Sequence, residues 1–294
     1  TYHAIREGEI FDYSKINWED VIDKNELQNH IKITNGKCSC LKFDNDNFTF
    51  SPTALLTYDE CPKKYELQNI FQMPERGAFE WSGASVGSFI HKLLEEGVRS
   101  GFKSKEEFVK HAEIMSTLSD WKEIDLVEVR KLLDIFWERH KGRYNEKSLV
   151  EQKLSFELGG FRFFGIADRI DFIKGKDVEV IDYKTNKNSI EPKKRAWQLG
   201  FYAMAAKKQL NLNPIKLTLE MLKLEKPIET EVDKDGNVKA GRSKGFNIKE
   251  VEEELVDCAK KIVKDYEGEF LPTEDENKCR FCGYKFYCPK WEEK

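Results

Sequence analysis

Two segments of the chain carry acidic residues at spacings that suit metal-dependent chemistry. One contains the run GIADRID over residues 165–171, and the other contains VIDYKT over residues 180–185. Side chains alternate along a strand, so Asp182 and Lys184 are expected on the same face. The apolar residues before Asp182 place its carboxylate beside a core, where an uncompensated charge is costly. Asp168, one strand away across a short turn, is therefore expected to share a divalent cation with Asp182.

Two carboxylates and a lysine around such a cation suit hydrolysis of a phosphodiester. The cation lowers the pKa of a water molecule and offsets charge on the phosphate. Lys184 adds a point charge for the oxyanion that develops, or helps to deprotonate the water. A D-x-K strand alone would favour a different interpretation, an ordinary exposed Asp–Lys pair. The independent acidic run over residues 165–171 favours the metal site instead.

Three further side chains become candidates only in company with the acidic segments. Gln198 and Tyr202 are four residues apart, so a helix places them on one face, from which they could reach back over the site. Alone, this pair favours a helix that simply packs on the sheet. His91 lies in a segment whose apolar residues recur at three- and four-residue spacing. A lone helical histidine is more often a surface or core residue than a ligand.

Cysteine spacing near the C-terminus predicts a second metal site. Cys279, Cys282 and Cys288 follow the pattern C-x2-C-x5-C, and loop-spaced cysteines of this kind are typical metal ligands. A closed tetrahedral site needs a fourth ligand, for which Cys61 is the best candidate, whereas Cys258 is expected to be a buried helical thiol. Zinc and a 4Fe–4S cluster both accept four thiolates. The single C-x2-C pair with one remote ligand favours the cluster.

Hydrophobic periodicity predicts the elements that must position these residues. Helices are expected over residues 53–67, 84–99, 105–117, 126–144 and 248–266 and around Trp197, and strands over 149–158, 161–167, 169–173, 178–184 and 215–224. A turn is expected at Gly159-Gly160 and a polar hairpin or loop over residues 231–244. This order predicts an α/β domain with a mixed central sheet flanked by helices. Residues 1–47 show no sustained period and are expected to form an arm or the end of a preceding domain, with residues 48–294 as one domain.

Taken together, these residues resemble a known family. The shared pattern consists of His91, Asp168, the run Asp182-Tyr183-Lys184, and Gln198-x3-Tyr202. In this pattern the chain resembles the RecB-like branch of the PD-(D/E)XK nucleases. The four cysteines resemble its iron–sulfur subgroup, which includes the AddB nuclease domain and the cluster-bearing CRISPR-adaptation nucleases. The resemblance spans about Phe50 to Pro289.

The resemblance implies a restriction-endonuclease-like core with Mg²⁺ or Mn²⁺ at its acidic face. It implies that the metal ligands are His91, Asp168, Asp182 and the main-chain carbonyl of Tyr183. Lys184 would be catalytic, with Gln198 and Tyr202 as accessory members of the catalytic set, and Glu151 is a candidate for an additional acidic member. It also implies a C-terminal clasp in which Cys61, Cys279, Cys282 and Cys288 hold a 4Fe–4S cluster, with zinc as the alternative.

Charge is compatible with a local nucleic-acid site. The 294 residues include 49 basic and 53 acidic side chains, a net charge of −4, which excludes a generally basic nucleic-acid binder but permits a basic groove. Four basic residues after the lysine strand are expected to contact phosphate, namely Lys187, Lys193, Lys194 and Arg195. Aromatic residues also interleave with the cysteines of the C-terminal loop. For these rings, packing around the metal site is favoured over stacking on unpaired bases.

The sequence therefore predicts a metal-dependent deoxyribonuclease that acts on single-stranded DNA or DNA ends in repair, recombination or processing. DNA and a helicase domain or subunit are the expected partners. The alternatives are a catalytically silent module that binds DNA or a partner in a helicase complex, and a zinc-stapled structural domain or redox carrier. The helices that handle DNA vary greatly within the family. The resemblance therefore implies neither the polarity of cleavage nor the length of the products for this chain.

Features of the whole chain bear on its setting. The count of seven cysteines is odd, and Cys38 and Cys40 are poorly spaced for a shared closed site. This usage predicts a reducing, cytoplasmic setting rather than a secreted disulfide scaffold. No run approaches the roughly 18 apolar residues of a membrane helix, and no secretory signal opens the chain, so no membrane contact is expected. Because the first residue is Thr1, a trimmed chain or a piece of a longer protein is expected.

Overall fold

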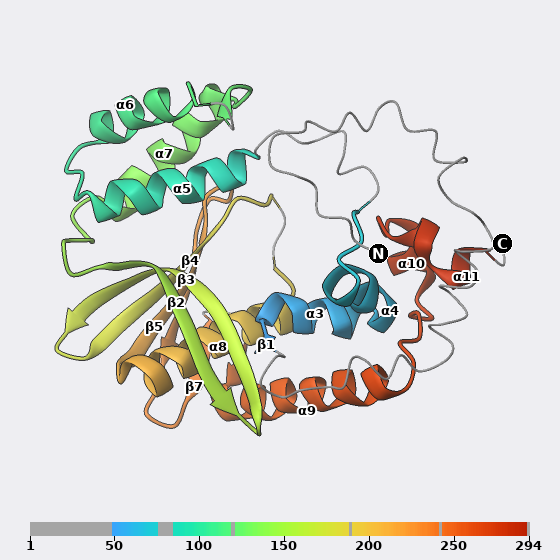
Figure 1. The fold of residues 1–294 in the computed structure, drawn as a ribbon. Helices are drawn as coiled ribbons and strands as arrows, with labels where there is room; N and C mark the ends of the chain where they lie inside the picture. Colours follow the sequence, from blue (N-terminus) through green and yellow to red (C-terminus); the bar gives the residue numbers. More distant parts are fainter. Residues whose placement is uncertain (1–48, 76–84, 119–120, 188–189, 241–242, 293–294) are drawn as a thin grey trace, which may run out of the picture. The chain divides into compact units, whose positions relative to one another are not determined.

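The computed structural model describes residues 49–75, 85–118, 121–187, 190–240 and 243–292, all within one compact unit, Asp44–Lys294 (Figure 1). The expected arm over residues 1–47, with Cys38 and Cys40, lies outside the described residues.

Eight strands form one mixed sheet in the described part of the chain. They are β1 (Thr49–Phe50), β2 (Leu149–Leu158), β3 (Phe161–Lys174), β4 (Asp177–Lys184), β5 (Asn213–Met221), β6 (Ile228–Val232), β7 (Asn237–Ala240) and β8 (Ser243–Asn247). β3 pairs with β1, β2 and β4, and the order then runs from β4 through β5, β6 and β7 to β8. The β1–β3 and β4–β5 pairs are parallel and the others antiparallel.

Helices cover both faces of this sheet (Figure 1). The longer ones are α3 (Pro52–Glu60), α5 (Val86–Arg99), α6 (Lys105–Met115), α7 (Leu126–His140), α8 (Pro192–Leu210) and α9 (Ile248–Glu267). The shorter ones are α4 (Pro62–Tyr65), the π-helix η2 (Glu66–Ile70), α10 (Glu276–Arg280), the 3₁₀-helix η5 (Lys285–Tyr287) and α11 (Pro289–Glu292). The expected fold class, a mixed central sheet flanked by helices, is confirmed. None of the described helices is both long and apolar enough to cross a membrane.

The sheet separates two hydrophobic cores, because successive side chains on β4 point in opposite directions. Val180 packs in the core beneath α3, α8 and α9, whereas Ile181 and Tyr183 pack in the core beneath α5, α6 and α7. Six consecutive residues of β4, Val178–Tyr183, are buried. This double burial places the charged residues Glu179 and Asp182 in the interior together with the apolar residues of the strand.

Several expected boundaries are wrong for local reasons. The helix expected over residues 53–67 breaks at Cys61, whose backbone is extended (φ −163°, ψ 114°), and Pro62 begins a new helix. The two strands expected over residues 161–173 are one continuous β3, and the hairpin expected over 231–244 belongs to the three-strand ladder β6–β8. The Gly159-Gly160 turn is confirmed, with φ values of +59° and +82°.

Candidate active site

The two acidic segments meet where β3 and β4 run side by side. Arg169 lies opposite Ile181 in this antiparallel pair, so the same register carried one residue further sets Asp168 against Asp182. The main-chain N–H of Tyr183 donates a hydrogen bond to Asp168 Oδ2 at 2.6 Å. The Asp168 carboxylate is thereby held against β4.

Asp182 is a buried carboxylate with a charged neighbour. It is 3% exposed, and Lys184 Nζ lies 2.5 Å from its Oδ2, so the predicted placement of these two side chains on one face is confirmed. Burial raises the pKa of Asp182, while the positive charge of Lys184 acts to lower it. A buried carboxylate needs cationic partners or hydrogen-bond donors to stay charged, and a divalent ion would supply a second cation beside Lys184.

His91 reaches the same region from α5. Ser85 caps this helix by accepting a hydrogen bond from Ser88 N, and the buried residues Phe89 and Ile90 set the helix phase that turns His91 toward the sheet. His91 Nδ1 lies 3.3 Å from Asp168 Oδ1. Burial alone would lower the pKa of His91, but the hydrogen bond with Asp168 and the nearby carboxylates together raise it.

Glu151 completes a three-residue group with metal-ligand spacing. One ligand atom each from His91, Glu151 and Asp168 lies within 4.8 Å of the others. Burial and the charge of Asp168 raise the pKa of Glu151. One nitrogen and two carboxylate oxygens are a donor set that suits Mg²⁺ or Mn²⁺, so the residues present fit the expected cation.

The backbone at Glu151 is unusual for a strand residue. Its φ is +47°, although its neighbours Val150 and Gln152 pair regularly with Arg169 and Ala167 on β3. A left-handed backbone at a residue other than glycine costs of order 1–3 kcal/mol and tends to occur at functional sites. The conformation brings the Glu151 carboxylate to the group rather than optimising the strand.

The α8 pair also lies at this site. Tyr202 OH donates a hydrogen bond to Asp182 Oδ1 at 3.0 Å, and burial raises the pKa of Tyr202 well above its ordinary value, so the phenol keeps its proton. Gln198, one turn earlier, is 7% exposed. Its Oε1 accepts no hydrogen bond from the described residues. Tyr202 on the predicted helix face therefore contacts the acidic strand β4, and Gln198 offers a buried acceptor one turn earlier on the same helix.

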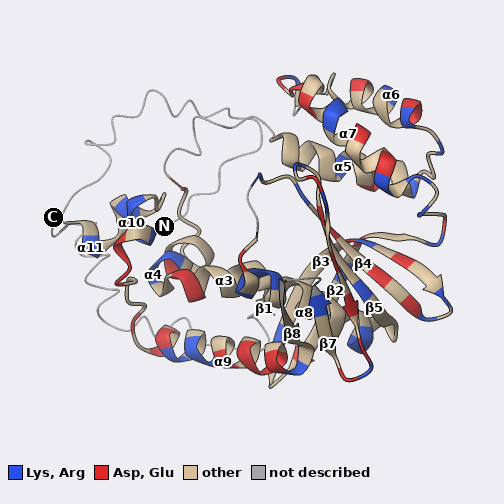
Figure 2. Cartoon of the chain, turned by 180° about the vertical axis from the view of Figure 1, so that it is seen from behind, with Lys and Arg blue, Asp and Glu red and all other residues tan. Residues whose placement is uncertain are grey.

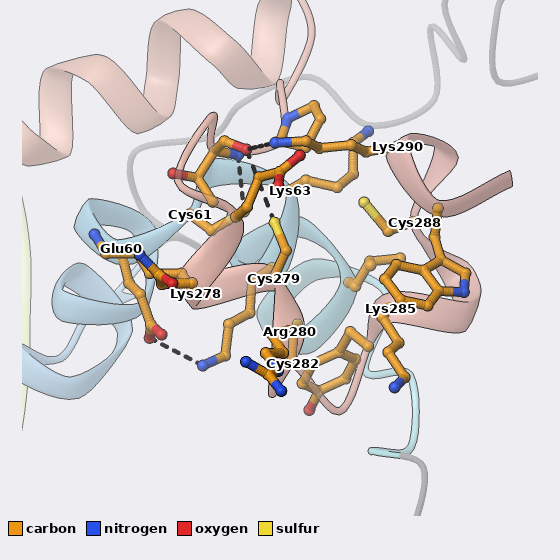
Figure 3. Close-up of a pocket in the computed structure, with 18 residues that line it drawn as sticks. Glu60, Cys61, Lys63, Lys278, Cys279, Arg280, Cys282, Lys285, Cys288 and Lys290 are labelled. Atoms are coloured by element: carbon orange, nitrogen blue, oxygen red, sulfur yellow. Dashed lines mark hydrogen bonds and ion pairs between the residues drawn. The ribbon is translucent and has the colours of Figure 1, made fainter. Parts of the chain in front are cut away.

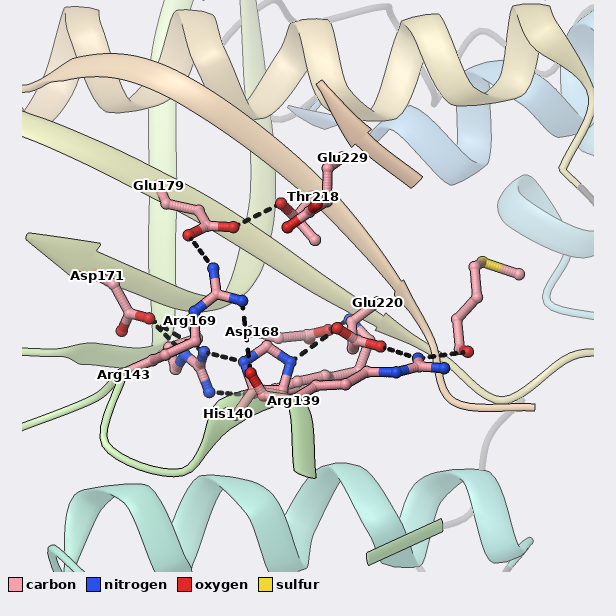
Figure 4. Close-up of polar contacts among 12 residues, drawn as sticks. Arg139, His140, Arg143, Asp168, Arg169, Asp171, Glu179, Thr218, Glu220 and Glu229 are labelled. Atoms are coloured by element: carbon pink, nitrogen blue, oxygen red, sulfur yellow. Dashed lines mark hydrogen bonds and ion pairs between the residues drawn. The ribbon is translucent and has the colours of Figure 1, made fainter. Parts of the chain in front are cut away.

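A buried polar network lies on the opposite face of the same strands (Figure 4). Arg169 is fully buried and donates to Asp171 Oδ2 at 3.1 Å, to Tyr183 OH at 2.7 Å and to His140 Nδ1 at 2.8 Å. His140 Nε2 then lies 2.7 Å from Glu220 Oε2. Because Arg169 follows Asp168 and Tyr183 follows Asp182, the network ties together the two strands that carry the ligands.

Sequence reasoning did not predict this network. Its members come from α7, β3, β4 and β5, and no local spacing relates them. The sequence run 165–171 did include Arg169 and Asp171, but they point away from the acidic site and stabilise the sheet from behind. A weak signal was the presence of charged residues inside strands that otherwise appear buried.

The four predicted cysteines surround one pocket of about 310 Å³ (Figure 3). Cys61 comes from the break between α3 and α4, and Cys279, Cys282 and Cys288 come from the C-terminal segment. All four have free thiols, as does Cys258, whose sulfur lies elsewhere, 3.7 Å from Leu55 O. The remote ligand predicted from sequence is therefore brought to the C-terminal three.

Main-chain N–H groups point at three of these sulfurs. Thr273 N donates to Cys61 Sγ at 3.3 Å, and the sulfurs of Cys282 and Cys288 accept from the main chain of Tyr284 and Lys290. Burial raises the pKa of both these thiols, while the N–H donors act to lower it. N–H donors to sulfur stabilise thiolates and are characteristic of metal-bound cysteines.

The four basic residues expected to bind phosphate do not share one environment. Lys187, Lys193 and Lys194 are exposed, although Lys193 Nζ also lies 2.6 Å from Asp59 Oδ1. Arg195 is only 5% exposed, so its side chain is far less accessible to phosphate than those of the three lysines. The phase of α8 turns this residue inward, which the run of basic letters did not reveal.

The mixed sheet flanked by helices is consistent with the restriction-endonuclease-like fold class. Residues 49–289 match the model of the PD-(D/E)XK nuclease superfamily, and the chain belongs to this superfamily.

Individual relatives are distant. The chain is 24% identical over 199 residues to a subunit of the ATP-dependent helicase/deoxyribonuclease of Clostridium perfringens, an alignment that covers 67% of this chain and 15% of that protein. It is 22% identical to the Gene 69 protein of Mycobacterium phage L5, with 81% of this chain and 95% of that protein covered. This chain thus spans about 15% of the length of the helicase/deoxyribonuclease relatives that it matches.

Two solved structures are similar at low identity. SSO0001 has a TM-score of 0.40 and 14% identity, with 95% of this chain and 98% of that one covered. A putative exonuclease from Eubacterium rectale has a TM-score of 0.44 and 9% identity, with 86% and 93% covered.

Proposed function

We propose that this chain is a metal-dependent deoxyribonuclease that hydrolyses phosphodiester bonds in single-stranded DNA or at DNA ends. The observation that carries the proposal is the convergence of His91, Glu151 and Asp168 beside the Asp182–Lys184 pair. Membership of a nuclease superfamily supports the reaction class. The name of the Clostridium perfringens relative supports DNA as the substrate and a helicase as the partner. A role in DNA repair, recombination or processing is part of the proposal.

His91, Asp168 and Asp182, together with the Tyr183 carbonyl, would hold Mg²⁺ or Mn²⁺, with Glu151 as a further acidic ligand. When bound, the cation supplies Lewis-acid polarisation of the phosphate and acidifies water. The carboxylates supply the negative charge that selects a divalent cation over solvent sodium.

Side chains of the protein perform the remaining tasks. Lys184 is half-buried beside Asp182, where its ammonium group can stabilise charge on a phosphate oxygen in the transition state. Tyr202 fixes one oxygen of Asp182 by donating a hydrogen bond. Gln198 presents a buried carbonyl oxygen that can orient a water molecule or a sugar hydroxyl. Lys187, Lys193 and Lys194 are proposed as phosphate contacts outside this centre.

We further propose that the four cysteines hold a 4Fe–4S cluster. All four thiols are free and line one pocket of about 310 Å³. The single C-x2-C pair with one remote ligand favours a cluster over a single zinc ion. Free thiols that face a shared pocket suit a reducing, cytoplasmic compartment.

Replacement of the active-site lysine tests the proposed reaction. Lys184→Ala should abolish cleavage of a labelled single strand in Mg²⁺ or Mn²⁺, while binding of the strand persists. Lys174→Ala, at an exposed position near the far end of β3, is the matched control and should cleave normally. Full activity of Lys184→Ala would reject the mechanism. Binding without cleavage by the unmodified chain would instead support the alternative of a silent binding module.

A further inference from the structure

The C-terminal segment exposes an unusual set of aromatic rings. Phe281 is 85% exposed, Phe286 48%, Trp291 41% and Tyr287 36%. The rings come from the segment that contributes Cys279, Cys282 and Cys288. Trp291 also lines the cysteine pocket, as the sequence led us to expect, whereas Phe281, Phe286 and Tyr287 do not line it. Large apolar groups left in water in one short segment indicate an interaction surface.

The segment itself is well anchored, so the exposure of the rings does not reflect a lack of packing. Tyr284, in the middle of the segment, is 5% exposed. Lys290 Nζ donates to Thr273 O at 2.7 Å, and the N–H···S bonds tie the backbone to the cysteines. The same short segment therefore buries Tyr284 and leaves Phe281 and Phe286 in solvent, while Arg280, Lys285 and Trp291 stand at the edge of the pocket that they help to line.

Cations lie directly over the exposed rings. The guanidinium of Arg280 lies 5.5 Å from the centre of the Phe281 ring. Lys285 Nζ lies 5.2 Å from the centre of the Phe286 ring and 5.0 Å from that of Trp291. Such cation–π pairs hold positive charge and a flat apolar face at the same place. The ribbon of α10 and α11 includes Lys and Arg positions, coloured blue in Figure 2.

We propose that this surface, formed by Arg280, Phe281, Lys285, Phe286 and Trp291, is a stacking platform for unpaired bases of single-stranded DNA. Rings can stack on bases of any sequence, while the adjacent cations neutralise the phosphates. Inside a duplex the bases are stacked on one another and offer such a surface only the phosphates. This inference rests on the proposed nuclease function and deepens it. It names a second site, separate from the acidic centre, at which the DNA strand is bound.

Binding measured in EDTA separates the platform from the chemistry. With a labelled oligothymidylate and the full chain, Phe281→Leu should weaken binding about 5- to 150-fold, since stacking contributes about 1–3 kcal/mol per base. Phe281→Tyr keeps a flat ring and should bind like the unmodified chain. Lys285→Ala should lower the salt dependence of binding by about 0.7 in the log–log slope. Ile114→Ala, another exposed apolar side chain (55%) on α6, is the control.

An abasic strand of equal length makes the test specific for stacking. It keeps the phosphates, so Phe281→Leu and the unmodified chain should bind it equally weakly. The platform is refuted if Phe281→Leu binds oligothymidylate normally, or if Phe281→Tyr loses as much affinity as Phe281→Leu. The platform is also refuted if the unmodified chain does not bind the oligonucleotide. That result would instead favour a protein partner as the ligand of this surface. Hydrolysis of bis(p-nitrophenyl) phosphate with Mn²⁺ reads out the acidic centre separately and should be the same in every variant.

Discussion

Tyr202 on α8 donates a hydrogen bond across 3.0 Å to Asp182 on β4, so a helix on one side of the sheet fixes a buried carboxylate of the acidic site. The four-residue spacing of Gln198 and Tyr202 predicted one helix face, and the alternation of Asp182 and Lys184 predicted one strand face. The hydrogen bond joins these two faces. Its donor stays protonated because burial raises the pKa of Tyr202.

Loss of this donor should shift the pH dependence of cleavage. Burial raises the pKa of Asp182, and the Tyr202 hydrogen bond acts to lower it. Tyr202→Phe should raise this pKa further and move the acid limb of the pH–rate profile to higher pH, because a protonated carboxylate binds cations poorly. Stability should fall by about 1.5–3 kcal/mol. Tyr144→Phe is the control: this buried hydroxyl donates to Phe102 O, and its loss should leave the profile unmoved.

The left-handed backbone at Glu151 predicts opposite effects on stability and activity. Glu151→Gly removes the carboxylate and accepts a φ of +47° without strain, so the unfolding midpoint should be equal or higher. Divalent cation affinity and cleavage should fall at least tenfold, as for other metal-supporting residues. Glu151→Gln keeps the strained backbone and should lose cation affinity, with a gain in stability limited to relief of the burial cost and of the repulsion with Asp168. If Glu151→Gly kept normal cation affinity, Glu151 would have no place in the metal group.

Stability of the buried network should depend on pH through His140. Arg169 donates to Nδ1, so Nε2 carries the proton that is donated to Glu220, and the ring is neutral. Burial lowers the pKa of His140, although Glu220 acts to raise it. Below about pH 6.5 the unfolded chain therefore binds a proton that the folded chain does not. As the pH falls through this range, the free energy of unfolding decreases by up to about 1.4 kcal/mol for each pH unit.

His91 and Glu220 also change the pH dependence of stability. The contribution of His140 is therefore measured by comparing a His140 variant with the unmodified chain. The pKa of His91 is raised, so His91 acts in the opposite sense and stabilises the fold as the pH falls. The pKa of Glu220 is lowered by its cationic partners despite burial, so its stabilisation is lost at lower pH. Urea unfolding at pH 7.5 and 5.5 should therefore show a smaller loss on acidification for His140→Gln than for the unmodified chain. Equal losses would contradict a neutral His140.

The cysteine pocket should contain iron. Anaerobically purified protein is expected to carry about four iron atoms per chain with a broad visible absorbance. Cys279→Ser should lower both and destabilise the C-terminal segment, since ligand binding and folding are coupled. Cys258→Ser, outside the pocket, should keep both. A content of one zinc ion per chain, with no visible absorbance, would contradict the cluster and show that the four cysteines form a zinc site.

Local patterns predicted which candidate residues share a face, because each pair lies within one short segment of the sequence. Asp182 and Lys184 are two residues apart on one strand, and Gln198 and Tyr202 are one helical turn apart, so spacing alone placed each pair on a common face. Asp168 could be added because a short turn joins β3 and β4. Even the remote Cys61 could be inferred, since three clustered thiols lacked a fourth.

Tertiary context determined what the patterns missed. Arg169 meets His140 and Glu220 only because three strands and a helix pack together. Arg195 belongs to a basic run, but the phase of α8 buries it. Phe281 looked like a packing residue because aromatic rings usually are, whereas its exposure depends on how the cysteines fold the C-terminal segment. Each case turns on a face or a partner that sequence spacing does not specify.

The account rests most directly on divalent cation-dependent cleavage through Asp182. The decisive measurement compares the unmodified chain with Asp182→Asn on a labelled single strand across a Mn²⁺ titration, with cation binding followed by calorimetry. The account predicts cleavage by the unmodified chain only when the cation is present. It predicts that Asp182→Asn folds and binds the strand but neither binds the cation normally nor cleaves. Cleavage in EDTA, or equal cleavage by Asp182→Asn, would contradict it.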